Sequence, residues 1–172
     1  NQPNKGSFIE TVTASKYYSQ YKLYKKTNIV AFNAPKATIL LDSIEGENRH
    51  VKLQIETLRN ANRIELLAKD SIVFKSFIVN GEVLKKPENK QYVFNTGKRK
   101  NVLSYYFTKP NEMIELEYII DSKANPTLEL QEVKYDLFTN KLLNVAPRKN
   151  SIMMPTPFVI NDATIIKKII RF

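Results

Sequence analysis

Hydrophobic and polar residues alternate along most of the chain from about Ala37 onward. The clearest alternating segments are 51–57, 62–68, 113–120 and 127–135. A period of two places successive side chains on opposite faces of a strand, whereas a helix face needs a spacing of three to four residues. No convincing amphipathic helix separates these segments. The pattern therefore predicts an all-β fold, an antiparallel β-sandwich of roughly eight to ten strands.

Turn residues divide the remaining apolar runs into further strands. Segment 71–79 is apolar and β-branched, and it is interpreted as one strand that runs into Asn80-Gly81. Both of these residues tolerate a positive φ, so Asn-Gly between apolar residues predicts a hairpin. Segments 91–96 and 101–108 are predicted strands joined by a turn at Gly97 and the basic residues after it.

The two ends of the chain differ from the alternating middle. Residues 1–28 are predicted to form a linker or arm, and 29–172 a single domain. Within the arm, four tyrosines in segment 8–26 are spaced three and four apart, which suits a helix face, but tyrosine also favours strands, so both readings stay open. Because the first residue is Asn1 rather than Met, we expect the chain to be either a piece of a longer protein or a processed chain.

The segment from 146 to 172 ends with a strongly apolar stretch. Residues 146–160 contain prolines and methionines and are predicted to form an extended strap across the core. Residues 164–172 are predicted to be a last strand that completes a sheet. Its alternation puts Ile166, Ile170 and Phe172 on one face and cations among the residues of the other.

The net charge favours an acidic partner, but its distribution weakens that inference. The chain has 27 Lys and Arg against 17 Asp and Glu, a formal charge of +10. The basic residues are scattered in short groups rather than gathered on one stripe, which disfavours nucleic acid. Many fall where strand edges are expected, and lysine there discourages pairing between edges. An anionic membrane surface stays a candidate partner.

Residues for catalysis or metal binding are scarce. The chain has no cysteine and one histidine, His50, which is interpreted as a surface residue in a polar turn. Its four glycines are too far apart for a phosphate-binding loop. The carboxylate pairs Glu115/Glu117 and Glu129/Asp136 could in principle do acid–base work. Glu115 and Glu117 are instead interpreted as solvent-facing residues of a half-buried strand, because alternation is the ordinary strand pattern. The sequence thus predicts no catalytic, cofactor-binding or metal-binding residue, and no enzyme within this chain.

A surface interaction is the remaining chemical hypothesis. Three consecutive cations at a predicted hairpin tip could contact lipid headgroups, and adjacent tyrosines could contact sugars or bases. Neighbouring strand residues point to opposite faces, so one or two of the three aromatic residues Tyr105, Tyr106 and Phe107 are expected in the core. The candidate residues are Lys98, Arg99, Lys100, Tyr105 and Tyr106.

Several segments, taken in order, resemble a known family. They are Asn33-Ala34-Pro35, Asp42, Arg49 and the strand that begins at Val51, followed by the hairpin. The tail adds Met153-Met154-Pro155-x-Pro157-Phe158, Asn161-Asp162-Ala163-Thr164 and a basic, apolar last strand. Residues 30–172 resemble the C-terminal domain of multi-pass membrane zinc aminopeptidases of metallopeptidase family 28, which includes relatives of the endoplasmic reticulum and vacuole membranes.

The resemblance implies an accessory role. In that family a separate N-terminal domain holds zinc, transmembrane helices follow, and a β-rich domain ends the chain on the non-cytoplasmic side. None of the family's zinc ligands, nor its catalytic glutamate, can be placed on this sequence. The implied function is a non-catalytic domain on the periplasmic face of a bacterial membrane. It would dock on its own catalytic domain and transmembrane region or form a homo-oligomer, and shape substrate access. The alternative is a stand-alone binding module for glycans or anionic surfaces.

Overall fold

The computed structural model describes residues 10–11, 23–24, 28–84, 92–94, 101–146 and 162–172. The chain divides into two units, Asn1–Ala31 and Phe32–Phe172. In the first unit, β1 (Glu10–Thr11) pairs antiparallel with β2 (Leu23–Tyr24), with Glu10 opposite Tyr24. The second unit contains the other strands, and every described element of the chain is a strand.

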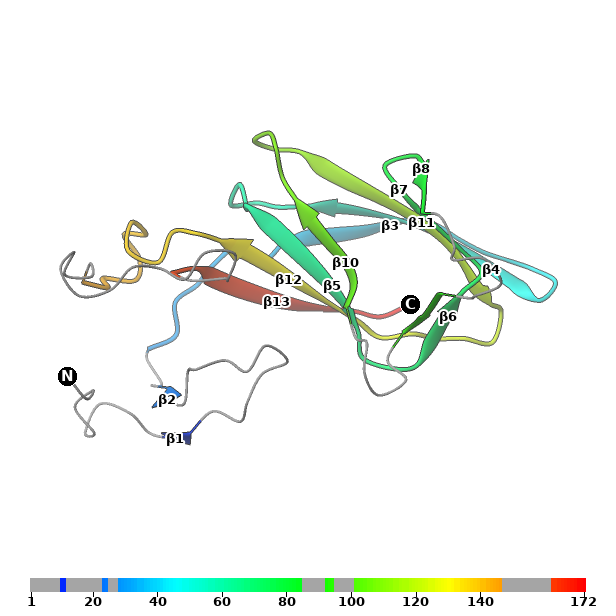
Figure 1. Cartoon of the computed structure of the whole chain (residues 1–172), viewed down its shortest axis with the longest axis horizontal. Coiled ribbons are helices and arrows are strands. Elements are labelled where there is room, and N and C mark those ends of the chain that lie inside the picture. The colour runs from blue at the N-terminus through cyan, green and yellow to red at the C-terminus, as the bar shows by residue number, and fades with distance from the viewer. Residues whose placement is uncertain (1–9, 12–22, 25–27, 85–91, 95–100, 147–161) are drawn as a thin grey trace. The chain divides into compact units, whose positions relative to one another are not determined.

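One sheet of the second unit has four antiparallel strands. Their order across the sheet is β10 (Asn101–Tyr106), β5 (Arg63–Ala68), β12 (Leu128–Lys134) and β13 (Thr164–Ile170). Figure 1 shows this sheet crossing in front of β3 and β4. The central strand β5 pairs with β10 on one side and β12 on the other, so both of its edges are satisfied.

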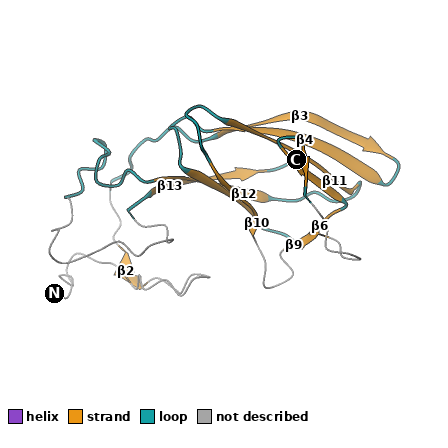
Figure 2. Ribbon diagram, turned by 45° about the horizontal axis from the view of Figure 1, so that its top comes forward, coloured by secondary structure: helices purple, strands orange, loops and turns teal. Residues whose placement is uncertain are grey.

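The other sheet has five antiparallel strands. Their order is β3 (Lys36–Glu45), β4 (Asn48–Glu56), β11 (Met113–Asp121), β7 (Ser76–Val79) and β8 (Glu82–Val83). Figure 2 shows β3 along the margin of this sheet, beside β4. A short separate pair joins β6 (Ile72–Phe74) to β9 (Tyr92–Phe94).

The core lies between the two sheets and confirms the predicted antiparallel sandwich. Leu53 and Leu116 from one sheet and Ile64 and Leu130 from the other are 0% exposed. Each alternates with polar neighbours on its strand, as the period-two pattern predicted. Deleting a buried leucine of this kind typically costs about 2–5 kcal/mol.

An aromatic group closes one part of the core. The ring centroid of Phe74 lies 5.0 Å from that of Phe77 and 5.2 Å from that of Tyr118, both edge to face. Phe172 meets Tyr118 at 6.1 Å. These geometries are the favoured ones for aromatic pairs. The residue at position 172 therefore contributes to the core.

One predicted turn and the predicted last strand agree with the structure. Asn80 and Gly81 link β7 to β8 with φ values of 51° and 85°, as an Asn-Gly hairpin requires. The last strand is also confirmed, because β13 pairs with β12 and forms the edge of the four-stranded sheet. The predicted strap at 146–160 falls, apart from Ala146, outside the described residues.

Two sequence interpretations were wrong. Segment 71–79 is two strands that break at Lys75, because β6 pairs with β9 whereas β7 joins β11 in the five-stranded sheet. His50 lies inside β4, opposite Ile119 and Ser43, and not in a turn. The turn comes earlier, at Gly46, whose φ is 58°. Alternation did not reveal the strand at His50, because the polar residue Arg49 occupies a core-side position of β4, opposite the buried Ile120.

Candidate functional site

The face of the four-stranded sheet that points away from the core carries an unusual set of side chains. Ile64 and Leu66 of β5 enter the core, so Arg63 and Glu65 point the other way. The strand registers place residues of β10, β12 and β13 beside them. We call this surface the outer face, and define it by Arg63, Glu65, Tyr106, Glu129, Gln131, Val133, Ile165, Lys167 and Ile169.

An ion pair capped by an aromatic ring occupies the β5–β10 part of the outer face. Arg63 forms an ion pair with Glu65, and both residues are more than nine-tenths buried. The Arg63 guanidinium carbon lies 5.0 Å from the centroid of the Tyr106 ring, a cation–π contact. Tyr106 itself is 58% exposed. The ring is thus held in place by the cation beneath it and presents its other surface outward.

A second charged group lies on β12 and β13. Glu129 accepts hydrogen bonds from Lys69 Nζ at 2.9 Å and Gln131 Nε2 at 2.6 Å, and Lys167 Nζ lies 3.8 Å away. Burial alone would raise the pKa of Glu129, but these donors and cations outweigh it and hold the pKa below its usual value. The Glu129 carboxylate is therefore ionised at neutral pH and fixed in position.

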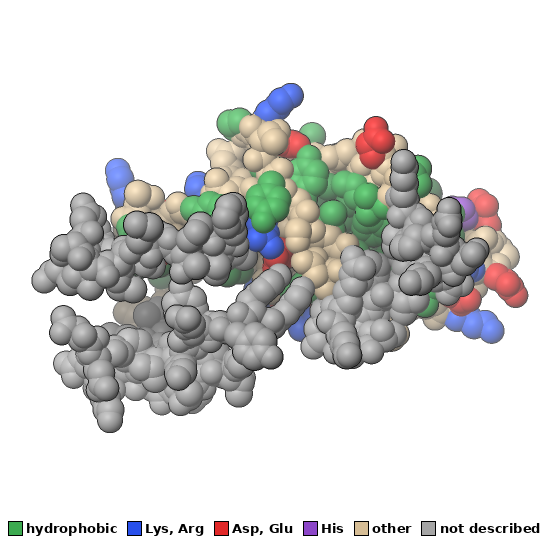
Figure 3. Space-filling view, viewed as in Figure 1, with side chains coloured by type: hydrophobic (Ala, Val, Ile, Leu, Met, Phe, Trp, Pro, Cys, Tyr) green, Lys and Arg blue, Asp and Glu red, His purple; other side chains and the backbone are tan. Residues whose placement is uncertain are grey.

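Exposed aliphatic residues border these fixed charges. Ile165 and Ile169 are 46% and 42% exposed on β13, on either side of Lys167. Figure 3 shows hydrophobic, basic and acidic side chains meeting over β5 and β10 on this side of the molecule. Aromatic residues and arginine are enriched at protein interfaces, and charges held by neighbours lose little freedom on binding. The exposed part of the outer face, with Tyr106, Ile165 and Ile169, therefore combines aromatic and aliphatic side chains in a way that suits a protein partner.

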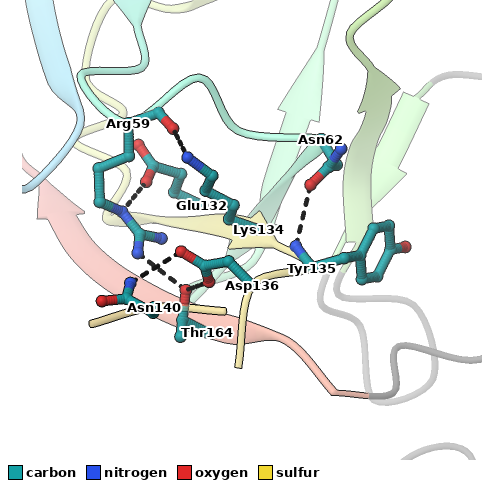
Figure 4. Close-up of polar contacts among 8 residues, drawn as sticks. All are labelled: Arg59, Asn62, Glu132, Lys134, Tyr135, Asp136, Asn140 and Thr164. Atoms are coloured by element: carbon teal, nitrogen blue, oxygen red, sulfur yellow. Dashed lines mark hydrogen bonds and ion pairs between the residues drawn. The ribbon is translucent and has the colours of Figure 1, made fainter. Parts of the chain in front are cut away.

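A polar cluster at one end of the sheet holds β13 in place (Figure 4). Glu132 is 0% exposed and accepts a hydrogen bond from Arg59 Nε at 2.6 Å. Arg59 also donates to Thr164 of β13 at 2.8 Å, and Thr164 donates to Asp136 at 2.6 Å. Lys134 donates to the Arg59 carbonyl oxygen. The cluster ties the first residue of β13 to the loop after β4.

Burial sets the electrostatics of this cluster. It raises the pKa of Glu132 above the usual value, and the Arg59 guanidinium only partly offsets this effect. Among the residues that the structure describes, Glu132 Oε2 and Arg59 Nη2 find no hydrogen-bond partner. The sequence analysis did not identify Glu132, although its position in the alternating pattern of β12 is a signal. Glu132 occupies the inward phase of β12 after Leu128 and Leu130, where an apolar residue is expected.

The structure separates the two predicted tyrosines. Tyr106 lies on the outer face, whereas Tyr105 packs edge to face on Phe107 at 5.4 Å and is hydrogen-bonded to Glu112 and Asn80. Tyr105 therefore stabilises the sandwich on the opposite face. Lys98, Arg99 and Lys100 lie outside the described residues.

The carboxylate pairs have structural partners. Glu115 and Glu117 share one face, as predicted, and both bind Lys52 Nζ, at 2.7 Å and 3.1 Å. Glu129 and Asp136 belong to the two separate groups described above. Within the described ranges, no three His, Cys, Asp or Glu side chains are grouped closely enough to hold a metal ion. The same ranges contain no helix with the length and apolarity needed to cross a membrane.

Asp42 and Arg49, both part of the family resemblance, form a bidentate ion pair. Arg49 Nε and Nη2 each donate to the Asp42 carboxylate at 2.7 Å, and Nη1 donates to the Ala124 carbonyl oxygen at 3.1 Å. The Arg49 hydrogen bonds hold the pKa of Asp42 below its usual value. The pair joins β3 and β4 to the connection between β11 and β12, which is a structural role.

Comparison of the chain with protein families, with curated proteins and with solved structures finds no significant match.

Proposed function

We propose that this chain is a non-catalytic accessory domain of a membrane-anchored zinc aminopeptidase, and that its outer face docks on the catalytic domain and shapes substrate access. The observation that carries the docking proposal is the outer face itself. It combines an exposed tyrosine held over Arg63, two exposed isoleucines and fixed ion pairs. The link to a peptidase rests on the sequence resemblance alone.

The energetics of the outer face favour a protein partner. Tyr106 is already oriented by Arg63, so little side-chain entropy is lost when a partner covers it. Ile165 and Ile169 add apolar area that is exposed in the isolated chain. The charges around Glu129 are neutralised by their own neighbours, which reduces the cost of removing water from them.

The parent protein would supply the chemistry. In the proposed arrangement, zinc is bound by the catalytic domain and activates the water that cleaves a peptide bond near the N-terminus of the substrate. The domain would lie on the periplasmic side of a bacterial membrane. These assignments extend the resemblance.

The docking proposal is tested by calorimetric titration of the chain into the purified catalytic domain of the parent protein. We expect binding, and an affinity loss of about tenfold or more for Tyr106→Ala, the usual effect of removing a central aromatic residue. Val83→Ala is a matched control, because Val83 is 65% exposed on β8 of the other sheet. Absence of binding, together with unchanged peptidase kinetics after deletion of the domain, would contradict the proposal.

The alternative is a binding module for glycans or anionic surfaces. The net charge of +10 and the exposed ring of Tyr106 favour it. Each cation near an anionic surface is worth about 1 kcal/mol, and salt weakens the attraction. Co-sedimentation with anionic vesicles at low salt, lost at high salt and lost on Lys98→Glu/Lys100→Glu, would favour this module over protein docking.

A further inference from the structure

The edge strand β3 is long and carries exposed apolar side chains, and no strand among the described residues pairs with its outer edge. It is the end strand of the five-stranded sheet and has ten residues. Ile39, Leu40, Leu41 and Ile44 are 42%, 48%, 48% and 63% exposed. Such an edge offers unpaired backbone donors and acceptors to another strand, and proteins usually protect it. The apolar edge of β3 is therefore a surface that favours pairing with a further strand.

Two features of β3 resemble protective devices but do not act as such. Asp42 lies on the core side, where a charge would oppose pairing, yet Arg49 of the same chain neutralises it through two hydrogen bonds of 2.7 Å. The register with β4 shifts between Ile39 and Leu41, which makes Leu40 a bulge. A bulge usually disrupts an edge, but here it changes which residues share a face.

The bulge divides β3 into two halves of opposite phase. Before it, Ala37 and Ile39 lie opposite Ile55 and Leu53, which are core residues of β4. After it, Leu41 lies opposite Lys52 on the outward side, whereas Asp42 lies opposite the core residue Val51. Odd-numbered residues are thus on the core side before Leu40, and even-numbered residues are on the core side after it.

This change of phase makes β3 complementary to itself. In an antiparallel pair of identical strands about a two-fold axis, opposed residues must share a face. With Leu40 opposite Leu41 of the partner subunit, every further pair up to the strand ends satisfies this condition. The pairs are Ile39 with Asp42, Thr38 with Ser43, Ala37 with Ile44, and Lys36 with Glu45.

The same register is also complementary in charge. It puts Lys36 of each copy opposite Glu45 of the other, twice by symmetry, and two leucine pairs at the axis. A shift by two residues places Lys36 opposite Ser43 and loses both ion pairs. Opposite charges and apolar side chains across a strand pair each stabilise it, whereas like charges destabilise it.

We propose that β3 pairs with β3 of a second copy in this register, so that the five-stranded sheets of two copies form one continuous sheet. The proposed homodimer uses the edge of one sheet, and the outer face of the other sheet remains free. It is therefore independent of docking to a catalytic domain. Tyr106→Ala leaves the dimer unchanged under this proposal, which separates the two tests.

Charge reversal tests the register in the whole 172-residue chain by sedimentation velocity over a concentration series. We expect a monomer–dimer equilibrium for the wild type. Lys36→Glu places two like-charge pairs in the interface and weakens dimerisation about tenfold, and adding Glu45→Lys restores it. Lys141→Glu is the matched control, because it makes the same charge change at an exposed site outside β3.

Cysteine cross-linking tests the same register without relying on stability. The chain has no cysteine, so introduced thiols have no native competitor. Opposed Cα atoms in an antiparallel pair are about 4.5–5.5 Å apart, within the range of a disulfide. The double variant Thr38→Cys/Ser43→Cys should form a covalent dimer on oxidation, and Thr38→Cys alone should not.

Two results would overturn the proposed β3–β3 dimer. A wild-type chain that is monomeric at every concentration and a double variant that does not cross-link would overturn the proposal. So would a dimer that Lys36→Glu leaves unchanged, because its interface would be another surface. If Lys36→Glu unfolds the chain, as judged by circular dichroism, cross-linking of the folded double variant decides.

Discussion

At the scale of single residues, the Asp42–Arg49 pair gives a pH-dependent contribution to stability. A carboxyl group whose folded pKa is lowered stabilises the fold above its ordinary value of 3.8, and this contribution disappears as the pH falls through the folded value. We expect Asp42→Asn to lower the free energy of unfolding by about 0.5–1 kcal/mol at pH 7, since the pair is partly exposed. Urea titrations at pH 7 and pH 3 measure the difference, which should shrink at pH 3. Glu82→Gln, which removes a charge at an exposed site of β8, should show no such difference.

Glu132 affects the pH dependence of stability in the opposite direction. Its folded pKa is raised, so ionisation of this group opposes folding, and its contribution improves as the pH falls from the raised value toward 4.5. Arg59→Met leaves the ionised Glu132 carboxylate buried without its counter-charge, and we expect a loss of about 3 kcal/mol at pH 7. Thermal and urea denaturation measure it.

A double variant tests the reason for that loss. Arg59→Met/Glu132→Leu replaces the buried pair by apolar side chains and should be more stable than either single variant. Equal destabilisation by the pair and by the singles would contradict the account, because shape rather than charge would then dominate.

At the scale of elements, β13 completes the four-stranded sheet. Ile170 is 6% exposed, Phe172 packs on Tyr118, and seven residues pair with β12. Removal of residues 164–172 opens the core and exposes the edge of β12, so we expect aggregated or insoluble protein. Size-exclusion chromatography after expression checks this. Ile169→Thr changes an exposed residue of the same strand and should remain monodisperse. A truncated chain that stays soluble with unchanged stability would be contrary evidence.

The hairpin from β7 to β8 depends on backbone conformation. Gly81 has a φ of 85°, and a Cβ there would meet no atom within 4 Å. Gly81→Ala should therefore cost about 1 kcal/mol through backbone strain alone. Thermal denaturation measures the loss. A loss well above this value would mean that the side chain has displaced a neighbour.

Sequence reasoning predicted the elements better than their arrangement. Alternation identified β4, β11 and β12 and the face that each buries, because the period of two is local. Alternation could not show that β5 lies between β10 and β12. It indicates which face of a strand is buried, but not which strands lie on either side of it. It also did not show the break at Lys75, where both flanking segments are apolar and only their partners differ.

The candidate site was predicted only in part. Tyr106 was identified, and the opposite orientation of Tyr105 follows from strand geometry. Arg63, Glu129 and Ile165 were not identified, because they come together only through pairing of strands that are distant in sequence. The buried position of Glu132 was not predicted. A single polar residue at an inward position of a strand does not indicate a buried ion pair unless its partner, Arg59, is known.

At the scale of the whole molecule, the core belongs to one unit. Among the residues that the structure describes, all buried hydrophobic side chains lie between Pro35 and Ile170, inside the second unit. We therefore expect residues 32–172, produced alone, to melt within about 4 °C of the full chain, the shift that about 1 kcal/mol causes at this size. Differential scanning calorimetry measures this difference. A much larger decrease would show that residues 1–31 contribute to the stability of the second unit.

The pairing order has a consequence for how the chain reaches its fold. The β3–β4 hairpin joins neighbouring segments, so it can form within about microseconds. Its partner β11 and the strands around β5 must close long loops first, which is typical of sandwiches that fold over about milliseconds to seconds. During that interval both edges of the hairpin are unpaired, and one of them carries Ile39, Leu40 and Leu41. Refolding yield should therefore fall as protein concentration rises, because the early hairpin can meet another chain before β11 reaches it.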